Sequence, residues 1–261
     1  MVFFRKDSIE ILVRHAIFSD ISKHKKRPSY FNRKRSYENL LATIDPSFKV
    51  TFFLDLYHGS LQEHFLSKEK KHPVITFKEG TESGAFLYLL EYIAALDVSD
   101  NPIIYIVEDD YIHRKGWGKI LLDAFSLPQI DYATLYDHKD KYTFSQYEEL
   151  RSKIFAGKYS HFRTTPSTTN TFAARLATFK EDLSIHRRYS EGRKISADHE
   201  KCLALQEKGR ILVSAIPGWS THAERDFLSP CIDWKKELTQ TLVPKKSLLK
   251  KLFFAKKGSA S

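Results

Sequence analysis

The stretch Ile103-Ile104-Tyr105-Ile106-Val107-Glu108-Asp109-Asp110-Tyr111 decides the fold, because a continuous apolar run stops abruptly at three carboxylates. Such an apolar run is typical of a central strand that is covered on both faces. Strand and helix patterns alternate along the first half of the chain, which favours a largely parallel α/β sheet. Ligands bind such sheets at the carboxyl ends of the strands, where we expect Glu108, Asp109 and Asp110 to lie.

The same patterns predict the other elements. Apolar runs predict strands over residues 9–13, 49–54, 73–77, 132–136 and 211–216. Helical spacing predicts helices over residues 36–44, 80–96, 116–125, 171–183 and 196–208, with Ser196 as the N-cap of the last. Residues 19–35 are interpreted as a basic loop and residues 161–170 as a polar, threonine-rich loop. Asp55 directly follows the second strand, so the fold would bring it to the same edge as the acidic triplet.

Length and composition set limits on the protein class. The 261 residues are enough for one sizeable domain, which we place at residues 1–240, with a basic extension over residues 241–261. The two cysteines, Cys202 and Cys231, form no CxxC pair, which argues against a zinc knuckle or a disulfide framework and fits a reducing compartment. The sequence shows neither a signal-peptide pattern nor an apolar run long enough to span a bilayer. We therefore expect a cytoplasmic protein.

The net charge of +10 suits an acidic partner such as phosphate, nucleic acid, anionic lipid or anionic glycan, and by itself selects none of them. The basic run over residues 23–27 could hold phosphates or an anionic acceptor, or could be a solvated loop. A nucleic-acid-binding protein would need a recognisable module, or basic residues interleaved with aromatic ones on one face. The sequence contains no such module, so we expect no nucleic-acid partner and keep that class as an alternative.

Three adjacent carboxylates repel one another, so a core strand that ends in them needs a neutralising charge. Mg²⁺ and Mn²⁺ prefer carboxylate oxygens and often share them with substrate phosphates. A metal bound here would stabilise negative charge on a leaving phosphate group. The alternative interpretation is a solvated acidic turn.

In their order along the chain, these motifs resemble those of GT-A glycosyltransferases. Glu108-Asp109-Asp110 resembles the DxD motif in its EDD form, and Leu54-Asp55 resembles the aspartate that contacts the nucleotide. Glu79-Gly80 with Ser83-Gly84-Ala85 resembles the N-x-G segment and the helix before the DxD strand. The resemblance runs from about Ile9 to about His222. It departs at residues 13–15, which replace the usual Pro-x-(Tyr/Phe)-Asn ending, and at residues 56–60, which replace the common Asp/Gly/Ser run.

The resemblance implies a GT-A (Rossmann-like) mixed, mostly parallel sheet flanked by helices. It also implies a hexosyl or glycosyl transferase that moves a sugar from a nucleotide-diphosphate sugar to a glycan or lipid-linked acceptor, with Mn²⁺ or Mg²⁺ as cofactor. The donor would contact Arg14, Asp55, Glu108 and Asp109. The metal would be held by Asp110 with Glu108, and by His222, which resembles the late histidine of many such enzymes.

In inverting members of the family, a carboxylate that opens a helix downstream of the DxD motif takes the proton of the acceptor hydroxyl. Asp198 lies at the matching place, where the helix dipole would favour its ionised form. His199 and Glu200 are the substitutes for this role, and capping alone would also explain an aspartate there.

Hydroxyl, amide and aromatic side chains bind sugars, so we assign Thr169, Asn170 and Trp219 to the acceptor, with Trp117 as a further stacking aromatic. The alternative for the polar residues is a turn-forming loop.

The C-terminal segment over residues 245–257 interleaves lysines with leucine and phenylalanine. Such a segment suits an anionic membrane interface, or a final helix that packs on the domain with its lysines outward. We expect a peripheral position on the inner face of the membrane and a role in polysaccharide biosynthesis. The remaining alternatives are a non-catalytic domain of the same fold and a metal-dependent nucleotidyltransferase or phosphohydrolase, although the sequence lacks a P-loop.

Overall fold

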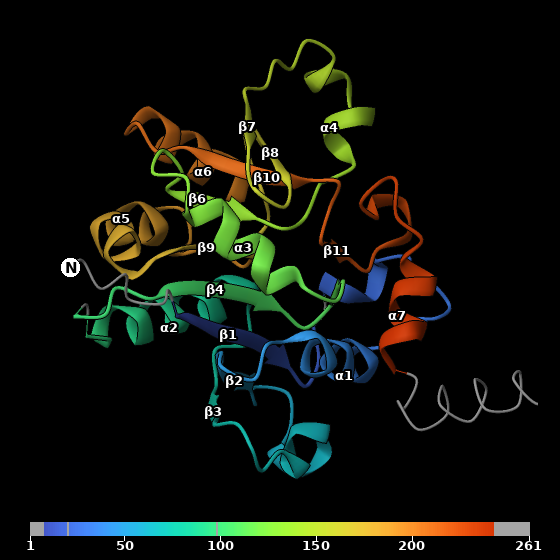
Figure 1. The fold of residues 1–261 in the computed structure, drawn as a ribbon. Coiled ribbons are helices and arrows are strands. Elements are labelled where there is room, and N and C mark those ends of the chain that lie inside the picture. The colour runs from blue at the N-terminus through green and yellow to red at the C-terminus, as the bar shows by residue number, and fades with distance from the viewer. Residues whose placement is uncertain (1–7, 20, 98, 243–261) are drawn as a thin grey trace, which may run out of the picture.

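The computed structural model describes residues 8–19, 21–97 and 99–242, which are arranged in layers around one mixed sheet (Figure 1). Within these residues nine strands form the sheet in the order β3-β2-β1-β4-β9-β6-β10-β8-β7. In that order the strands are Val74–Phe77, Lys49–Asp55, Ile9–Ala16, Ile103–Glu108, Phe172–Arg175, Tyr132–Thr134, Leu212–Ile216, His161–Thr164 and Ile154–Ala156. Strands β1 to β4 run parallel to one another, β6 runs parallel to β10, and β9 lies antiparallel between β4 and β6. The predicted mixed, mostly parallel α/β sheet is confirmed.

Helices cover both faces of the sheet, as the apolar run of β4 predicts (Figure 1). Tyr105 and Val107 belong to one core cluster with α1 and α3, whereas Ile104 and Ile106 belong to a second cluster with α2, α5 and α6. The α-helices α1 to α7 are Arg33–Thr43, Glu82–Ala95, Trp117–Phe125, Asp140–Thr143, Leu176–Arg188, Asp198–Glu207 and Trp234–Leu242. Short 3-10 helices lie at Ile21–His24, Leu61–Glu63, Phe65–Lys68, Ser145–Tyr147 and Arg225–Phe227.

Three sequence predictions are wrong. Residues 171–183 do not form one helix: their first part is β9, and the helix α5 begins only at Leu176. The small buried residues Ala173 and Ala174 let β9 fit between β4 and β6, so sheet pairing overrides the helical spacing. Residues 161–164, predicted as loop, form β8 against β10. The N-cap of α6 is Ala197, because the Ser196 hydroxyl instead pairs with Ser83.

A two-stranded sheet that the sequence did not reveal lies directly after the acidic triplet. Strand β5, Tyr111–His113, pairs antiparallel with β11, Ser220–His222, so that His222 lies opposite Tyr111. The buried Asn39 of α1 fixes β5, because its Oδ1 accepts from the backbone N–H of His113 at 2.7 Å and its Nδ2 donates to the carbonyl at 3.0 Å. This pairing brings a late histidine to the end of β4.

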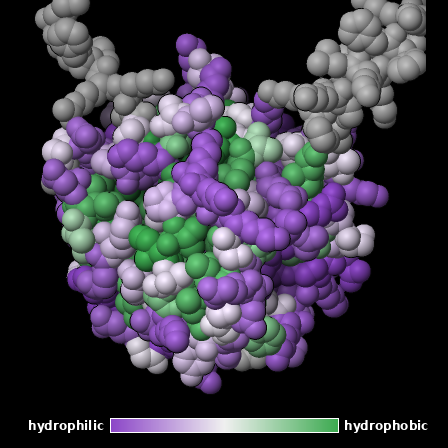
Figure 2. Space-filling model, turned by 90° about the horizontal axis from the view of Figure 1, so that it is seen from below, coloured by the Kyte–Doolittle hydropathy of each residue, from purple (hydrophilic) through white to green (hydrophobic). Residues whose placement is uncertain are grey.

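No helix in the described part of the chain combines the length and the apolar character needed to cross a membrane. The predicted amphipathic segment, residues 245–257, lies outside the described residues. On the face seen in Figure 2, hydrophobic residues reach the surface in patches bordered by hydrophilic side chains. At one edge of the sheet lies β3, in which only Phe77 is buried.

Candidate functional site

A cavity of about 550 Å³, here called the edge cavity, opens at the carboxyl ends of β1, β2 and β4. This is the edge at which open α/β sheets bind ligands. Its lining contains all four residues that the sequence assigned to the donor and two of the three that it assigned to the metal, Glu108 being in both sets: Arg14, Asp55, Glu108, Asp109 and Asp110. The structure therefore brings together residues from three different strands, as the position of each after a strand predicted.

The buried Asp55 carboxylate organises one wall of the edge cavity. Its Oδ1 accepts hydrogen bonds from the backbone N–H groups of Tyr57 at 2.9 Å and Glu79 at 3.2 Å, and its Oδ2 accepts one from Gly80 at 2.7 Å. Gly80 has a φ of +73°, and a Cβ there would come within 2.6 Å of the Tyr57 ring. Asp55 thus fixes the turn that presents the exposed Tyr57 ring to the cavity, and a direct nucleotide contact of Asp55 stays a prediction.

Two carboxylates of the triplet are each paired with an arginine. Glu108 Oε1 lies 3.1 Å from Arg14 Nη2, and burial raises the pKa of Glu108 to about 7 although Arg14 acts in the opposite direction. Asp109 Oδ2 lies 3.1 Å from Arg33 Nε, and burial likewise raises the pKa of Asp109. Because a buried carboxylate needs compensating charge or hydrogen bonds, these arginines stabilise the ionised forms.

The third carboxylate, Asp110, lies among several cationic or ionisable groups. Its Oδ2 is 2.7 Å from Arg27 Nη2 and 3.0 Å from His222 Nε2. Lys25 Nζ lies 3.6 Å from the same oxygen and 3.1 Å from His222 Nε2. Burial opposes ionisation, but His222, Lys25 and Arg27 together hold the pKa of Asp110 well below its ordinary value. The other oxygen, Oδ1, is buried and has no hydrogen-bond partner among the described residues.

Glu82, the first residue of α2, is the centre of a buried network behind the triplet. Its Oε1 lies 3.0 Å from Arg14 Nη1 and 2.8 Å from Asn170 Nδ2, and its Oε2 accepts from the backbone N–H of Ser196 at 2.8 Å. Burial alone would raise the pKa of Glu82, but Arg14 and these hydrogen bonds hold it at about 2. Asn170 Oδ1 in turn accepts a hydrogen bond from Lys201, so the network continues to α6.

Asp198, the predicted base, lies at the other end of this network as the first residue of α6. Its Oδ1 is 2.8 Å from Lys201 Nζ, and its side chain stays 27% exposed. Burial raises the pKa of Asp198, while Lys201 acts to lower it. Asp198 lines a second cavity of about 220 Å³, here called the α6 cavity, together with Thr169, His138 and other polar side chains.

The residues predicted to bind the acceptor separate in the structure. Thr169 lines the α6 cavity, and its Oγ1 lies 2.6 Å from the hydroxyl of Tyr111, next to the triplet. Asn170 is buried in the Glu82 network and lines neither of these cavities. Trp117 is fully buried, so it cannot stack on a sugar. Trp219 is half-buried under the guanidinium of Arg114, 4.3 Å away, and also lines neither cavity.

The sequence analysis missed several residues of this site. It noted the basic run that contains Lys25 and Arg27 but did not connect it to Asp110. It gave no role to Arg33 or to Glu82. The acidic triplet itself was a usable signal, because buried carboxylates require cationic partners from elsewhere in the chain. The position of Glu82 in the turn after Gly80 gives no comparable signal.

Solved structures resemble this chain in fold. The structure of residues 1–349 of S. aureus TarS matches with a TM-score of 0.50 and 9% identity, over 82% of this chain and 59% of that one. A protein described as a nucleotide-diphospho-sugar transferase from Desulfovibrio desulfuricans G20 matches at 0.47 and 10% identity, over 80% of each chain. CMP:2-keto-3-deoxy-manno-octonic acid synthetase in complex with CTP matches at 0.46 and 10% identity, over 81% of this chain and 92% of that one.

No family model and no curated protein matches the sequence. At such identities a structural likeness shows the fold alone, and the TarS match at a TM-score of 0.50 supports the GT-A-like α/β fold. The expected GT-A-like fold is thereby confirmed, and the function has to be argued from the residues of the site.

The Glu82 network should dominate the local stability. We expect Glu82→Ala to lower the free energy of unfolding by about 3 kcal/mol, because it leaves the buried Arg14 without this partner. The matched control is Glu91→Ala, which removes an exposed ion pair with Arg187 and should cost about 0.5 kcal/mol. Urea denaturation followed by circular dichroism measures both, and equal losses would contradict the structural role assigned to Glu82.

Proposed function

We propose that this protein is a glycosyltransferase that binds a nucleotide-diphosphate sugar in the edge cavity and transfers the sugar, with inversion, to a glycan or lipid-linked acceptor. One observation carries the proposal. In a GT-A-like fold, the carboxyl edge of the central strand ends in Glu108-Asp109-Asp110, and these carboxylates line a cavity large enough for a small-molecule ligand, with cationic side chains around them.

The groups around the edge cavity suit the parts of such a donor. The exposed Tyr57 ring offers a face on which a nucleobase can stack. Lys25, Arg33 and Arg14 line the same cavity, and a diphosphate would give these cations a second anionic partner beside the triplet. We therefore expect the diphosphate to lie over the triplet and the base toward Tyr57.

A divalent cation fits the residues at Asp110. The unpartnered Oδ1 of Asp110 and the nearby Nε2 of His222 are both ligand types that Mn²⁺ accepts, whereas Mg²⁺ prefers oxygen ligands and would use Asp110 Oδ1. The described residues contain no group of three or more His, Cys, Asp or Glu side chains placed to hold a metal. The chain would thus supply Asp110 and His222, and the diphosphate would supply further oxygens. Bound there, the cation would stabilise charge on the leaving nucleoside diphosphate.

Lys25 and Arg14 would also help to stabilise the negative charge on the leaving nucleoside diphosphate. Lys25 Nζ now lies against both His222 Nε2 and Asp110 Oδ2, so it would have to move aside when a metal binds. Glu108 is engaged by Arg14, and we therefore assign the metal to Asp110 and His222 and leave Glu108 to orient Arg14.

Asp198 would act as the general base on the acceptor hydroxyl. It lines the α6 cavity, and the Glu82 network joins it to Arg14 in the edge cavity. We expect the acceptor hydroxyl to bind beside Asp198 and to extend directly to the donor in the edge cavity. Lys201 favours the ionised form of Asp198, which is the form that accepts a proton. Lys201 is thus a positioning residue that also tunes the base.

A thermal-shift panel of nucleoside diphosphates, with and without Mn²⁺, tests donor binding. We expect one nucleotide to raise Tm in the presence of Mn²⁺, because a ligand that binds only the native state stabilises it. Asp110→Asn should weaken the Mn²⁺-dependent part of the shift. Glu91→Gln, on the exposed surface, serves as the control. Folded protein that no nucleotide stabilises would contradict the proposal and favour a non-catalytic domain.

The pH profile of transfer tests the base. Asp198→Asn should lower the transfer rate about 100-fold or more, whereas Glu200→Gln, an exposed carboxylate of the same helix turn, should leave it unchanged. Transfer requires ionised Asp198, so the rate falls as pH drops through its pKa. Lys201→Met removes the cation that lowers this pKa, so the acidic limb should move to higher pH. An unmoved limb, or a loss with Glu200→Gln instead, would exclude Asp198 as the base.

A further inference from the structure

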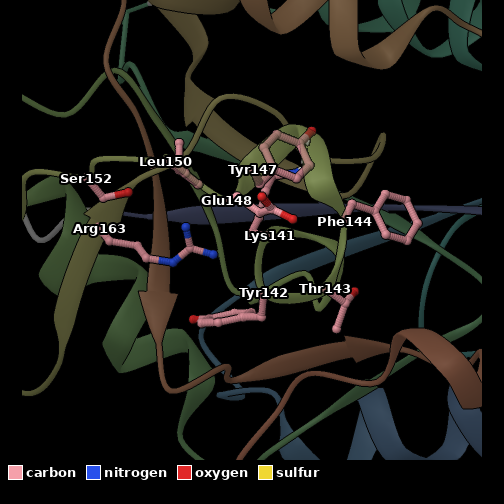
Figure 3. Close-up of a pocket in the computed structure, with 9 residues that line it drawn as sticks. All are labelled: Lys141, Tyr142, Thr143, Phe144, Tyr147, Glu148, Leu150, Ser152 and Arg163. Atoms are coloured by element: carbon pink, nitrogen blue, oxygen red, sulfur yellow. Dashed lines mark hydrogen bonds between the residues drawn. The ribbon is translucent and has the colours of Figure 1, made fainter.

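A third cavity, of about 470 Å³, lies beside the α6 cavity and has no part in the chemistry described above. We call it the distal cavity. Figure 3 shows its lining, which α4 and residues 144–148 supply on one side, and Arg163 of β8 with the segment before β7 on the other. The lining residues are Lys141, Tyr142, Thr143, Phe144, Tyr147, Glu148, Leu150, Ser152 and Arg163.

Two residues join the distal cavity to the α6 cavity. Lys141 and Tyr147 line both cavities, and Lys141 Nζ lies 3.2 Å from the Tyr147 hydroxyl and 3.1 Å from Ser167 Oγ. Asp198 lines the α6 cavity. The α6 cavity alone is smaller than the usual range for a small-molecule site, roughly 300–1,000 Å³, whereas the distal cavity falls within it. A ligand that reaches Asp198 therefore has room to extend past Lys141.

Tyr142 forms a prepared aromatic platform in the distal cavity. Its hydroxyl donates to Asp137 Oδ2 at 2.9 Å, and the guanidinium of Arg163 lies 5.2 Å from its ring centre. Figure 3 shows the guanidinium pointing toward this ring. Tyr142 nevertheless stays 56% exposed. An aromatic ring held in place binds the apolar C–H face of a sugar at little cost in conformational entropy.

The charges around the cavity identify the kind of sugar. Arg163 Nη2 lies 2.8 Å from Asp137, and Lys141 Nζ lies 2.9 Å from Asp140, so both cations of the lining are already paired with carboxylates. Glu148 adds a negative charge to the lining. Hydroxyl groups of Thr143 and Ser152 offer hydrogen bonds to sugar hydroxyls. These lining groups suit a neutral sugar. They carry no excess positive charge that would attract an acidic sugar.

We propose that the distal cavity is a second sugar-binding subsite, which holds a neutral sugar unit of an extended glycan acceptor while another unit lies beside Asp198. The inference rests on the proposed glycosyltransferase function and names the acceptor class of the same site. It predicts that the protein binds oligosaccharides better than single sugars, because only a longer chain reaches both cavities.

Direct glycan binding in the absence of donor tests the proposal. The full chain is applied to a panel of neutral oligosaccharides of one to six hexose units, with matched chains that carry glucuronate or a sugar phosphate. We expect the neutral chains of two or more units to bind most tightly. Tyr142→Ala should weaken binding of these longer chains roughly fivefold and leave single hexoses unaffected, whereas Tyr142→Phe keeps the ring and should bind nearly as the parent does.

The matched control is Tyr159→Ala, since Tyr159 is also exposed, has a cation over its ring (Lys119, as Tyr142 has Arg163) and lines none of the three cavities. The proposal is overturned if Tyr142→Ala has no effect on the longer chains, if only the acidic chains bind, or if no chain binds. Nucleotide binding by the same variants separates the two ideas. If nucleotides still raise Tm while any of these outcomes is observed, only the subsite is refuted. If no nucleotide raises the Tm of the unmodified protein, the proposed function itself is refuted.

Discussion

The structure depends on how three adjacent carboxylates, one buried and two partly buried, are neutralised at the end of a central strand. Arg14 comes from β1, Arg33 from the start of α1, and Lys25 and Arg27 from the loop between these elements. Arg14 pairs with Glu108 and Arg33 with Asp109, whereas Lys25 and Arg27 share Asp110. The acidic edge therefore also connects segments that are distant in sequence. The same arrangement makes the edge receptive to a diphosphate, because cations that already hold carboxylates in place can take a second anion without first being ordered.

From this edge the Glu82 network extends to the start of α6. Arg14, Glu82, Asn170, Lys201 and Asp198 form one chain of buried and partly buried polar contacts. Removing one member leaves a buried charge or amide without its partner, which explains why residues predicted to touch substrate are instead needed to hold the site. Asn170 is such a residue, and its neighbour Thr169 is the one that lines a cavity.

Much of the fold was predictable from the sequence, since apolar runs and helical spacing are local signals. The strand before the triplet, the helices on both faces and the position of Asp55 follow from them. Strand β9 could not be predicted in this way, because its alanines suit a helix as well as a strand. Only its pairing with β4 and β6 makes it a strand. The partners of the triplet were also hidden, because ion pairs between residues far apart in sequence leave no periodic pattern.

A crystal structure with a nucleoside diphosphate and Mn²⁺, with data collected for manganese anomalous scattering, tests the central claim most directly. The account predicts the nucleotide in the edge cavity, its base near Tyr57, and an anomalous peak beside Asp110 and His222, with Lys25 moved from its present place. A nucleotide bound elsewhere on the protein, with Lys25 still in contact with His222 and Asp110, would contradict it.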